Sequence, residues 1–198
     1  MGGLEQADAW LFQLLNHSLV RPELDDLMLF LTTPALSGHL FLLFALFIAV
    51  RKGNEAFYLI PLLLLAVGLA DFTASGIMKP LFHRIRPCFA LDGVRLLVEQ
   101  SRSWSFASSH AANSTAIASL VWLFFWRGEA VDKAFTVVVI LYATMVSFSR
   151  IYIGVHYPGD VLGGIVIGLA SAALMYTAFA WFVKNVVHRK AMRNGGAT

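Results

Sequence analysis

The sequence has a single cysteine, Cys88, and few charged residues, which make up 14% of its 198 positions. One thiol excludes an internal disulfide and a cysteine-based zinc cluster, and it gives no information about the redox compartment. The net charge is +3, but the basic residues lie between or after apolar runs and form no continuous face, which argues against nucleic-acid binding. The N-terminus lacks the basic start and cleavage site of a signal peptide, so we expect the hydrophobic segments themselves to direct membrane insertion.

Apolar residues are abundant instead: 58% of the chain is hydrophobic, and the mean hydropathy is +0.70. These values exceed those of soluble domains, so the bilayer is the expected solvent. We therefore predict an all-α, polytopic transmembrane helical bundle that forms one domain over residues 1–198. A bilayer core needs about 20 apolar residues per helix, and helix is the open-chain structure that satisfies the backbone in lipid. Five segments meet this requirement or approach it: residues 27–50, 56–78, 110–126, 134–148 and 161–183.

Two further features refine this prediction. Pro34 predicts a kink in the first span, because proline removes a backbone donor and crowds the preceding turn. Residues 4–15 place apolar side chains at helical spacing but also carry Glu5, Asp8 and Gln13. We expect this segment to be a helix that lies in the membrane interface, or a short sixth helix.

The distribution of positive charge predicts the orientation. Alternation of the spans places eight basic residues on one side: Arg51, Lys52, Arg127, Lys133, Lys184, Arg189, Lys190 and Arg193. The other side has seven: Arg21, Lys79, Arg84, Arg86, Arg95, Arg102 and Arg150. Three of these seven are candidates for chemistry, which leaves four. The positive-inside rule then predicts an external N-terminus, a cytoplasmic C-terminus and outward-facing candidate residues.

Three polar clusters interrupt the apolar chain, and alternation of the spans brings them to the same membrane surface. In the first cluster, Lys79 and Arg86 are seven residues apart and would share a helix face if the second span continues past Lys79. Pro80 makes that continuation irregular. In the second cluster, Ser108 and Ser109 precede an apolar helix, and they offer an N-cap and free backbone donors that attract phosphate.

The second cluster ends with His110, and the third contains Arg150, His156 and Asp160. Asp160 could hold His156 as a carboxylate–imidazole pair. Together the clusters supply three cations, two histidines, a carboxylate and a helix start, which suffice to hydrolyse a phosphate monoester or diphosphate. The cations neutralise phosphoryl oxygens, one histidine attacks phosphorus and the other protonates the leaving oxygen. This chemistry requires no metal or cofactor.

These residues resemble the type 2 phosphatidic acid phosphatase superfamily, which also includes glucose-6-phosphatase and the vanadium haloperoxidases. The family patterns Lys-x6-Arg-Pro, Pro-Ser-Gly-His and Ser-Arg-x5-His-x3-Asp are matched in order, beginning at Lys79, Ala107 and Ser149. Ala107 replaces the family proline, and Ser109 replaces the family glycine. The resemblance implies the following roles: nucleophile His156, its partner Asp160, general acid His110, and phosphate ligands Lys79, Arg86, Ser108, Ser109 and Arg150.

Other polar residues have two interpretations at this stage. Asp71 within the second span is either functional or a buried structural partner. Asn113 could support His110, although interhelical hydrogen bonding is favoured. His83 and Arg84 occupy free positions of the first pattern, where we expect contacts with headgroups or leaving groups. Cys88 is interpreted as a small apolar residue.

The expected function is hydrolysis of a membrane lipid phosphate or diphosphate at the outer face of a bacterial inner membrane. The resemblance favours undecaprenyl diphosphate; phosphatidylglycerophosphate, phosphatidic acid and lipid A 1-phosphate are alternatives. The expected partners are the lipid substrate and membrane lipids, with no nucleic acid and no obligate protein partner. A transporter or flippase that binds lipid phosphate without cleaving it is the rival class. Haloperoxidase chemistry is disfavoured by the lipid-embedded setting.

Overall fold

The computed structural model describes residues 2–187, and over that range it is helical with connecting turns and loops. The described residues form no β-strand, in agreement with the expected all-α class. In chain order the elements are α1 (Gly3–Ser18), η1 (Pro22–Leu24), α2 (Asp25–Thr32), α3 (Pro34–Lys52), η2 (Gly53–Glu55), α4 (Ala56–Asp71), η3 (Phe72–Met78), α5 (Lys79–Phe82), α6 (Pro87–Ala90), α7 (Ser109–Phe125), α8 (Ala130–Tyr152), α9 (Pro158–Phe182) and η4 (Val183–Val187).

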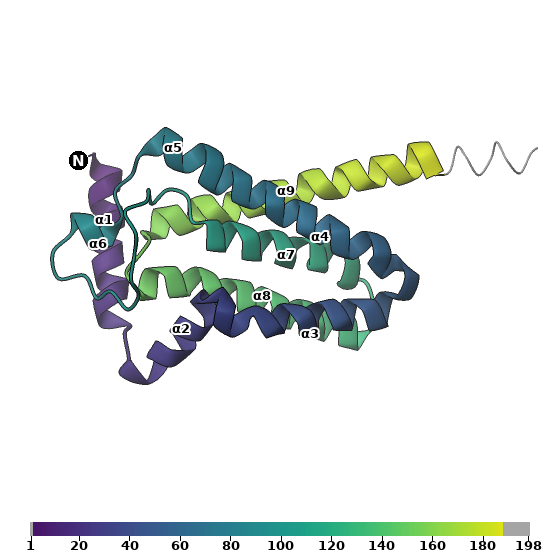
Figure 1. Cartoon of the computed structure of the whole chain (residues 1–198), viewed down its shortest axis with the longest axis horizontal. Helices are drawn as coiled ribbons and strands as arrows, with labels where there is room; N and C mark the ends of the chain where they lie inside the picture. Colours follow the sequence, from purple (N-terminus) through teal and green to yellow (C-terminus); the bar gives the residue numbers. More distant parts are fainter. Residues whose placement is uncertain (1, 188–198) are drawn as a thin grey trace, which may run out of the picture.

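The long helices form an elongated bundle (Figure 1). Three stretches of the described chain are long and apolar enough to cross a membrane: Ala35–Ala90, Ala130–Tyr152 and Pro158–Asn185. The first stretch contains both α3 and α4, which turn back on each other at η2. Helix α7 is central and packs against α4, α8 and α9. Large apolar side chains on the outer helices are exposed, as expected for a bundle whose surroundings are lipid.

The first two predicted spans are each interrupted near a proline. Thr33 has an extended backbone (φ −103°, ψ 106°) between α2 and α3, which is the conformation that a following proline favours. The predicted kink at Pro34 is therefore a break between two helices. In the second span, α4 continues through η3, a π-helix, into α5. The π-helix ends directly before Lys79 and was not predicted. The irregularity expected past Lys79 is the early end of α5 at Phe82, two residues after Pro80.

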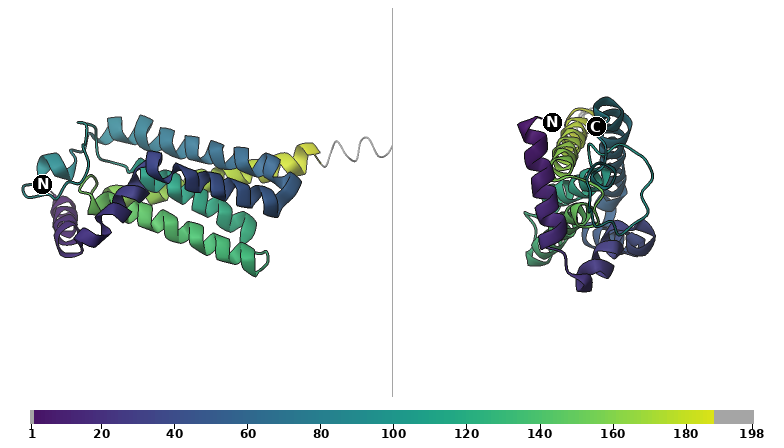
Figure 2. Two further views of the ribbon diagram at one scale, coloured as in Figure 1. Left: turned by 60° about the horizontal axis from the view of Figure 1, so that its bottom comes forward. Right: turned by 90° about the vertical axis from the view of Figure 1, so that its left-hand side faces the viewer.

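Helix α1 lies across one end of the bundle, whereas the long helices run along it (Figures 1 and 2). The Asn16 amide nitrogen donates to the carbonyls of Tyr152 at 2.9 Å and Ile151 at 3.1 Å. Its oxygen accepts from the Arg95 amide at 3.0 Å, and Phe12 is fully buried. This transverse placement is the one that an interfacial helix requires.

Small residues allow the neighbours of α7 to approach closely. A Cβ added at Gly164 or Gly168 of α9 would collide with the α7 backbone. Ala70 and Ala74, on α4 and η3, are fully buried in a cluster with Ala112. Small side chains are common between membrane helices, because association there depends on close packing. This packing fixes the first turns of α7 and α9, which carry two of the polar clusters.

Basic residues assigned to the cytoplasmic side lie at the bundle end opposite α1. Arg51 bonds to Glu129 and Asp132, each at 2.9 Å, and Lys52 donates to the Phe124 carbonyl at 2.9 Å. Three further members of this group, Arg189, Lys190 and Arg193, lie outside the described residues. The assignment of this end to the cytoplasm stays a prediction.

Candidate active site

The three polar clusters meet at the bundle end that α1 crosses (Figure 1). The first cluster covers α5 and the loop that follows it, the second lies at the start of α7, and the third connects α8 to α9. Hydrogen bonds connect Lys79 of the first cluster to Ser109 of the second, and Arg86 of the first to His156 of the third. Residues of all three clusters are thus in contact, as the alternation of the spans predicts.

His156 and Asp160 form a buried pair at the start of α9. Nδ1 of His156 lies 3.5 Å from Oδ2 of Asp160. The Ser105 hydroxyl is 2.5 Å from the same carboxylate oxygen and 3.4 Å from Nδ1, and the Tyr157 amide donates to that oxygen at 2.8 Å. Ser105 therefore joins the pair as a third member. The sequence places Ser105 in the second cluster, but the motif spacing assigns it no contact with the third.

Arg86 contacts the other side of the His156 ring. Its Nη1 lies 3.1 Å from Nε2 of His156 and donates to the Val155 carbonyl at 3.0 Å. Its Nε donates to the Ser103 carbonyl at 3.1 Å, and only 4% of Arg86 is exposed. Ser103 was not predicted, because it belongs to no motif. The guanidinium is held beside the nitrogen that would attack phosphorus.

Lys79 and Arg86 do not share a helix face. Helix α5 ends at Phe82, and His83 then adopts a left-handed backbone with φ 47°. The residues from 83 to 86 form a loop, which carries Arg86 to the third cluster. The expectation of a common face required a continuous helix over two turns, and the left-handed residue ends that helix.

Lys79 is held by two hydroxyl groups. Its Nζ donates to Ser109 Oγ at 3.0 Å and to Ser75 Oγ at 3.2 Å, and the two hydroxyl oxygens are 2.7 Å apart. Ser109 is one of the two positions that depart from the family pattern, and its side chain supplies one of these contacts. Ser75 lies on η3, four residues before Lys79, and was not predicted.

Ser108 is the N-cap of α7, as predicted. Its hydroxyl accepts from the Ala111 amide at 3.5 Å, and its own amide donates to the Asp160 carbonyl at 3.0 Å. The start of α7 is thereby attached to the start of α9. The first-turn amides and the positive end of the helix dipole point toward the cluster of cations, an arrangement that favours a bound anion.

Arg150 and His110 complete the predicted set. Arg150 is 7% exposed; its Nη1 donates to the Thr32 hydroxyl, and its Nε is buried without a partner among the described residues. His110 lies in the first turn of α7, directly after Ser109, whose hydroxyl contacts Lys79. A buried guanidinium with an unused donor suits an anion that brings its own acceptors.

Arg84 differs from the prediction that it contacts headgroups or leaving groups. Its two terminal nitrogens each donate at 2.7 Å, one to Asp160 Oδ1 and the other to Asp8 Oδ2. Its guanidinium also lies over the Tyr157 ring, 3.9 Å from the centroid. Asp8 additionally accepts from the Gly159 amide at 2.8 Å. A charge network therefore connects α1 to Asp160, and no sequence motif predicted Asp8 as a member.

The protonation state of His156 follows from its burial. Loss of solvation lowers the pKa of His156 to about 4, against an ordinary value of 6.5. The hydrogen bond to Asp160 raises the pKa, and the charges of Arg86 and Arg150 lower it. At neutral pH the imidazole is therefore uncharged and keeps a lone pair on one ring nitrogen, as a nucleophile requires.

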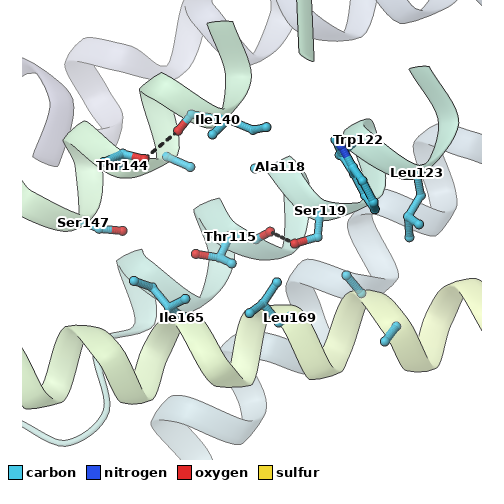
Figure 3. Close-up of a pocket in the computed structure, with 13 residues that line it drawn as sticks. Thr115, Ala118, Ser119, Trp122, Leu123, Ile140, Thr144, Ser147, Ile165 and Leu169 are labelled. Atoms are coloured by element: carbon cyan, nitrogen blue, oxygen red, sulfur yellow. Dashed lines mark hydrogen bonds between the residues drawn. The ribbon is translucent and has the colours of Figure 1, made fainter. Parts of the chain in front are cut away.

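Two cavities of the described residues differ in their relation to these side chains. One of about 340 Å³ borders Arg86 and is also lined by Ile85, Phe89, Arg102, Ser103 and Trp104. The other, of about 540 Å³, is a groove between α7, α8 and α9, lined by apolar side chains and a few hydroxyl groups (Figure 3). The larger groove contains no predicted site residue and no charged side chain. The larger cavity volume therefore does not mark the candidate site, since the charged side chains lie together at the bundle end that α1 crosses.

Apolar helices around a buried imidazole and several cations are the features of a helical membrane protein with a candidate anion site at one end. Residues 57–184 match the PAP2 superfamily. The chain therefore belongs to that superfamily, which is the family that the three motifs indicate.

Relatives within the superfamily include enzymes with different lipid substrates in their names. The chain is 30% identical over 117 residues to a lipid A 4'-phosphatase of Bacteroides thetaiotaomicron, covering 57% of this chain and 50% of that protein. It is 27% identical over 163 residues to undecaprenyl-diphosphatase BcrC of Bacillus subtilis, covering 82% and 77%. The crystal structure of LpxE from Aquifex aeolicus is similar with a TM-score of 0.66 and 28% identity, over 84% of this chain and 93% of that one. The chain spans about half the length of the lipid A 4'-phosphatase.

Proposed function

We propose that the protein is a membrane lipid phosphatase that hydrolyses a lipid phosphate or diphosphate through a phosphohistidine on His156. The observation that carries this proposal is the position of Arg86 Nη1, 3.1 Å from His156 Nε2. A phosphate attracted to the guanidinium arrives beside the lone pair of a neutral imidazole. On the opposite side of the ring, Asp160 and Ser105 lie near Nδ1, where an acceptor fixes the tautomer that leaves Nε2 free to attack.

The reaction proceeds in two steps that conserve atoms and charge. In the first, His156 Nε2 attacks phosphorus, the bond between phosphorus and the lipid oxygen breaks, and protonated His110 gives its proton to that oxygen. In the second, His110 takes a proton from water as the water attacks phosphorus. The phosphorus–nitrogen bond breaks, its electron pair returns to Nε2, and inorganic phosphate leaves.

The remaining residues stabilise the charge on the phosphoryl oxygens. Arg86 and Arg150 offer planar, bidentate donors, and Lys79 adds a point charge. The first turn of α7, with Ser108 as N-cap and Ser109 as the next residue, supplies backbone donors and the positive end of a dipole. Several preorganised donors around one phosphoryl group stabilise the transition state more than the ground state.

The membrane arrangement is part of the proposal. We infer five spans, formed by α2 with α3, α4 with α5, α7, α8 and α9, while α1 lies in the interface above them. The site then faces the exterior of a bacterial inner membrane, in accord with the excess of positive charge assigned to the other side. Support comes from the apolar stretches and from the transverse position of α1.

The substrate class proposed is a lipid phosphate. Two relatives carry lipid A and undecaprenyl diphosphate in their names. The feature that these two lipids share is a phosphate group attached to a hydrocarbon-bearing molecule. Undecaprenyl diphosphate, phosphatidylglycerophosphate, phosphatidic acid and lipid A phosphates are therefore the substrates to compare.

Release of inorganic phosphate distinguishes the phosphatase from a lipid-phosphate transporter or flippase. Purified protein in one detergent, given the four lipids in turn, should release phosphate from at least one of them. His156→Ala should abolish the release. His17→Ala, which removes an exposed histidine at the end of α1, is the matched control and should retain it. Full turnover by the His156→Ala protein would reject the mechanism.

A further inference from the structure

A ladder of polar side chains leads from Lys79 into the apolar part of the bundle, between η3 and α7. We define the polar ladder as Lys79, Ser75, Ser109, Asp71 and Asn113. Its first rung is the contact of Lys79 with the two serine hydroxyls. Its second rung is deeper: Asn113 Nδ2 donates to Asp71 Oδ1 at 3.1 Å. Ser109 and Asn113 are four residues apart on α7, so the second rung lies about 6 Å beyond the first.

The second rung has unused acceptors. Asn113 Oδ1 is buried and has no hydrogen-bond partner among the described residues. Asp71 is exposed at the surface of the bundle, and its bond to Asn113 uses one carboxylate oxygen only. A carboxylate within a membrane helix is costly, and such residues as a rule serve a function. Asp71 and Asn113 therefore form a site that a hydrogen-bond donor of a ligand would complete.

The opposite face of α7 offers nothing comparable. There the groove is lined mainly by apolar side chains, and two of its four hydroxyl groups are already bonded within their own helices (Figure 3). Ser119 donates to the Thr115 carbonyl at 2.7 Å, and Thr144 donates to the Ile140 carbonyl at 2.9 Å. A lipid that passes along the groove meets hydrocarbon, whereas a lipid that passes along the polar ladder meets acceptors.

We propose that Asp71 and Asn113 form a subsite that accepts hydrogen bonds from the lipid backbone next to the scissile phosphate. The inference rests on the proposed function, which places the phosphate at Lys79. A separation of about 6 Å corresponds to the part of a lipid directly attached to its phosphate. The preferred substrate therefore carries a hydroxyl or amide N–H there, as in a sphingoid, an N-acylated sugar or a lysoglycerolipid. Isoprenoid and diacylglycerol phosphates carry no such donor.

The physical basis is the cost of an unpaired polar group. Binding a lipid without a donor covers the exposed Asp71 carboxylate with hydrocarbon and leaves its second oxygen unsatisfied, beside the unpaired Asn113 Oδ1. A lipid with a donor satisfies them. The two rungs thus bind different parts of the lipid. Lys79 contacts the phosphate, and Asp71 and Asn113 contact the lipid atoms next to it.

The test uses two substrates that differ in one donor: a lysophosphatidic acid and its 2-O-methyl ether. We expect the wild-type protein to prefer the hydroxyl compound by about tenfold in kcat/KM, the value of one hydrogen bond. Asp71→Leu and Asn113→Leu should reduce this preference to near one, by lowering kcat/KM for the hydroxyl compound. Asp71→Asn keeps an acceptor and should keep the preference. Ser119→Ala, on the groove face, is the control that should change neither rate.

The outcomes separate this inference from the proposed function. Equal wild-type rates on the two compounds, or equal losses on both in Asp71→Leu, would overturn the subsite. Failure of the wild-type protein to release phosphate from any lipid would overturn the proposed function, and the subsite with it. Misfolding is not expected to obscure the result, because an apolar side chain is more stable than a carboxylate in the bilayer.

Discussion

Basic side chains occupy both ends of the bundle, but their partners differ. At the end opposite α1, Arg51 is paired with two carboxylates, and Lys52 with a carbonyl and the Phe125 ring. At the α1 end, Arg86 and Lys79 are held by carbonyls, hydroxyls and an imidazole, and Arg150 keeps a buried donor unpaired. Cations paired with carboxylates stabilise the fold, whereas cations without a counter-charge are prepared for an anionic ligand.

Among the basic side chains, Arg150 should have the largest effect on activity when it is removed. Arg150→Ala is expected to lower kcat/KM by about 100-fold or more, the scale observed when a transition-state donor is lost. The thermal midpoint in detergent should stay constant or rise, because a buried and incompletely bonded charge has been removed. Steady-state phosphate release and a melting curve on the same preparation measure both. Unchanged kinetics would exclude Arg150 from the site.

The second test is the pH dependence of stability. The pKa of His156 is about 4 in the folded protein and 6.5 as an ordinary value, so its contribution is complete above pH 6.5 and is lost as the pH falls through 4. The loss amounts to at most about 3 kcal/mol. Melting curves from pH 7 to 4 should therefore fall more steeply for the wild-type protein than for His156→Asn. Parallel curves would contradict the burial of an uncharged His156.

Arg84 sharpens the comparison, because it lies at the site end but is paired with two carboxylates. We expect Arg84→Gln to lower kcat about tenfold with little change in KM, since it contacts Asp160 and no phosphate oxygen. Arg84→Lys should recover part of kcat. Asp8→Asn should have a smaller effect in the same direction. A change confined to KM would indicate that Arg84 binds substrate directly, as the sequence suggested.

The smallest effect is expected at the opposite end. Arg51→Ala should leave phosphate release within about twofold of the wild-type rate and lower the thermal midpoint only slightly, because solvent screens partly exposed ion pairs. A large loss of activity here would remove the distinction between the two kinds of cation.

Much of the site geometry could be anticipated, because the motifs lie at the ends of apolar segments. A bilayer fixes where each helix starts and ends, so Lys79, His110 and Arg150 had to come to the same end once the alternation of spans was assumed. The break at Pro34 and the irregular backbone after Lys79 were predictable for a different reason, since a proline restricts the local backbone.

The contacts that were missed depend on loop conformation and on distant segments. Ser105 and Ser103 reach the site through a loop that no periodicity describes, and Asp8 contacts Arg84 across 76 residues. Arg86 does not share a helix face with Lys79, because the left-handed residue at position 83 ends the helix and cannot be inferred from a histidine. Interactions of this kind become visible only when the chain is folded.

The central claim is that His156 forms a covalent bond to phosphorus, and rapid quenching tests it most directly. Wild-type protein mixed with a lipid substrate, quenched within one turnover and analysed by mass spectrometry, should carry a phosphoryl group on His156. The same treatment of His156→Ala should yield no phosphorylated histidine. Phosphate on a different residue, or rapid turnover with an unmodified His156 at every time point, would contradict the account.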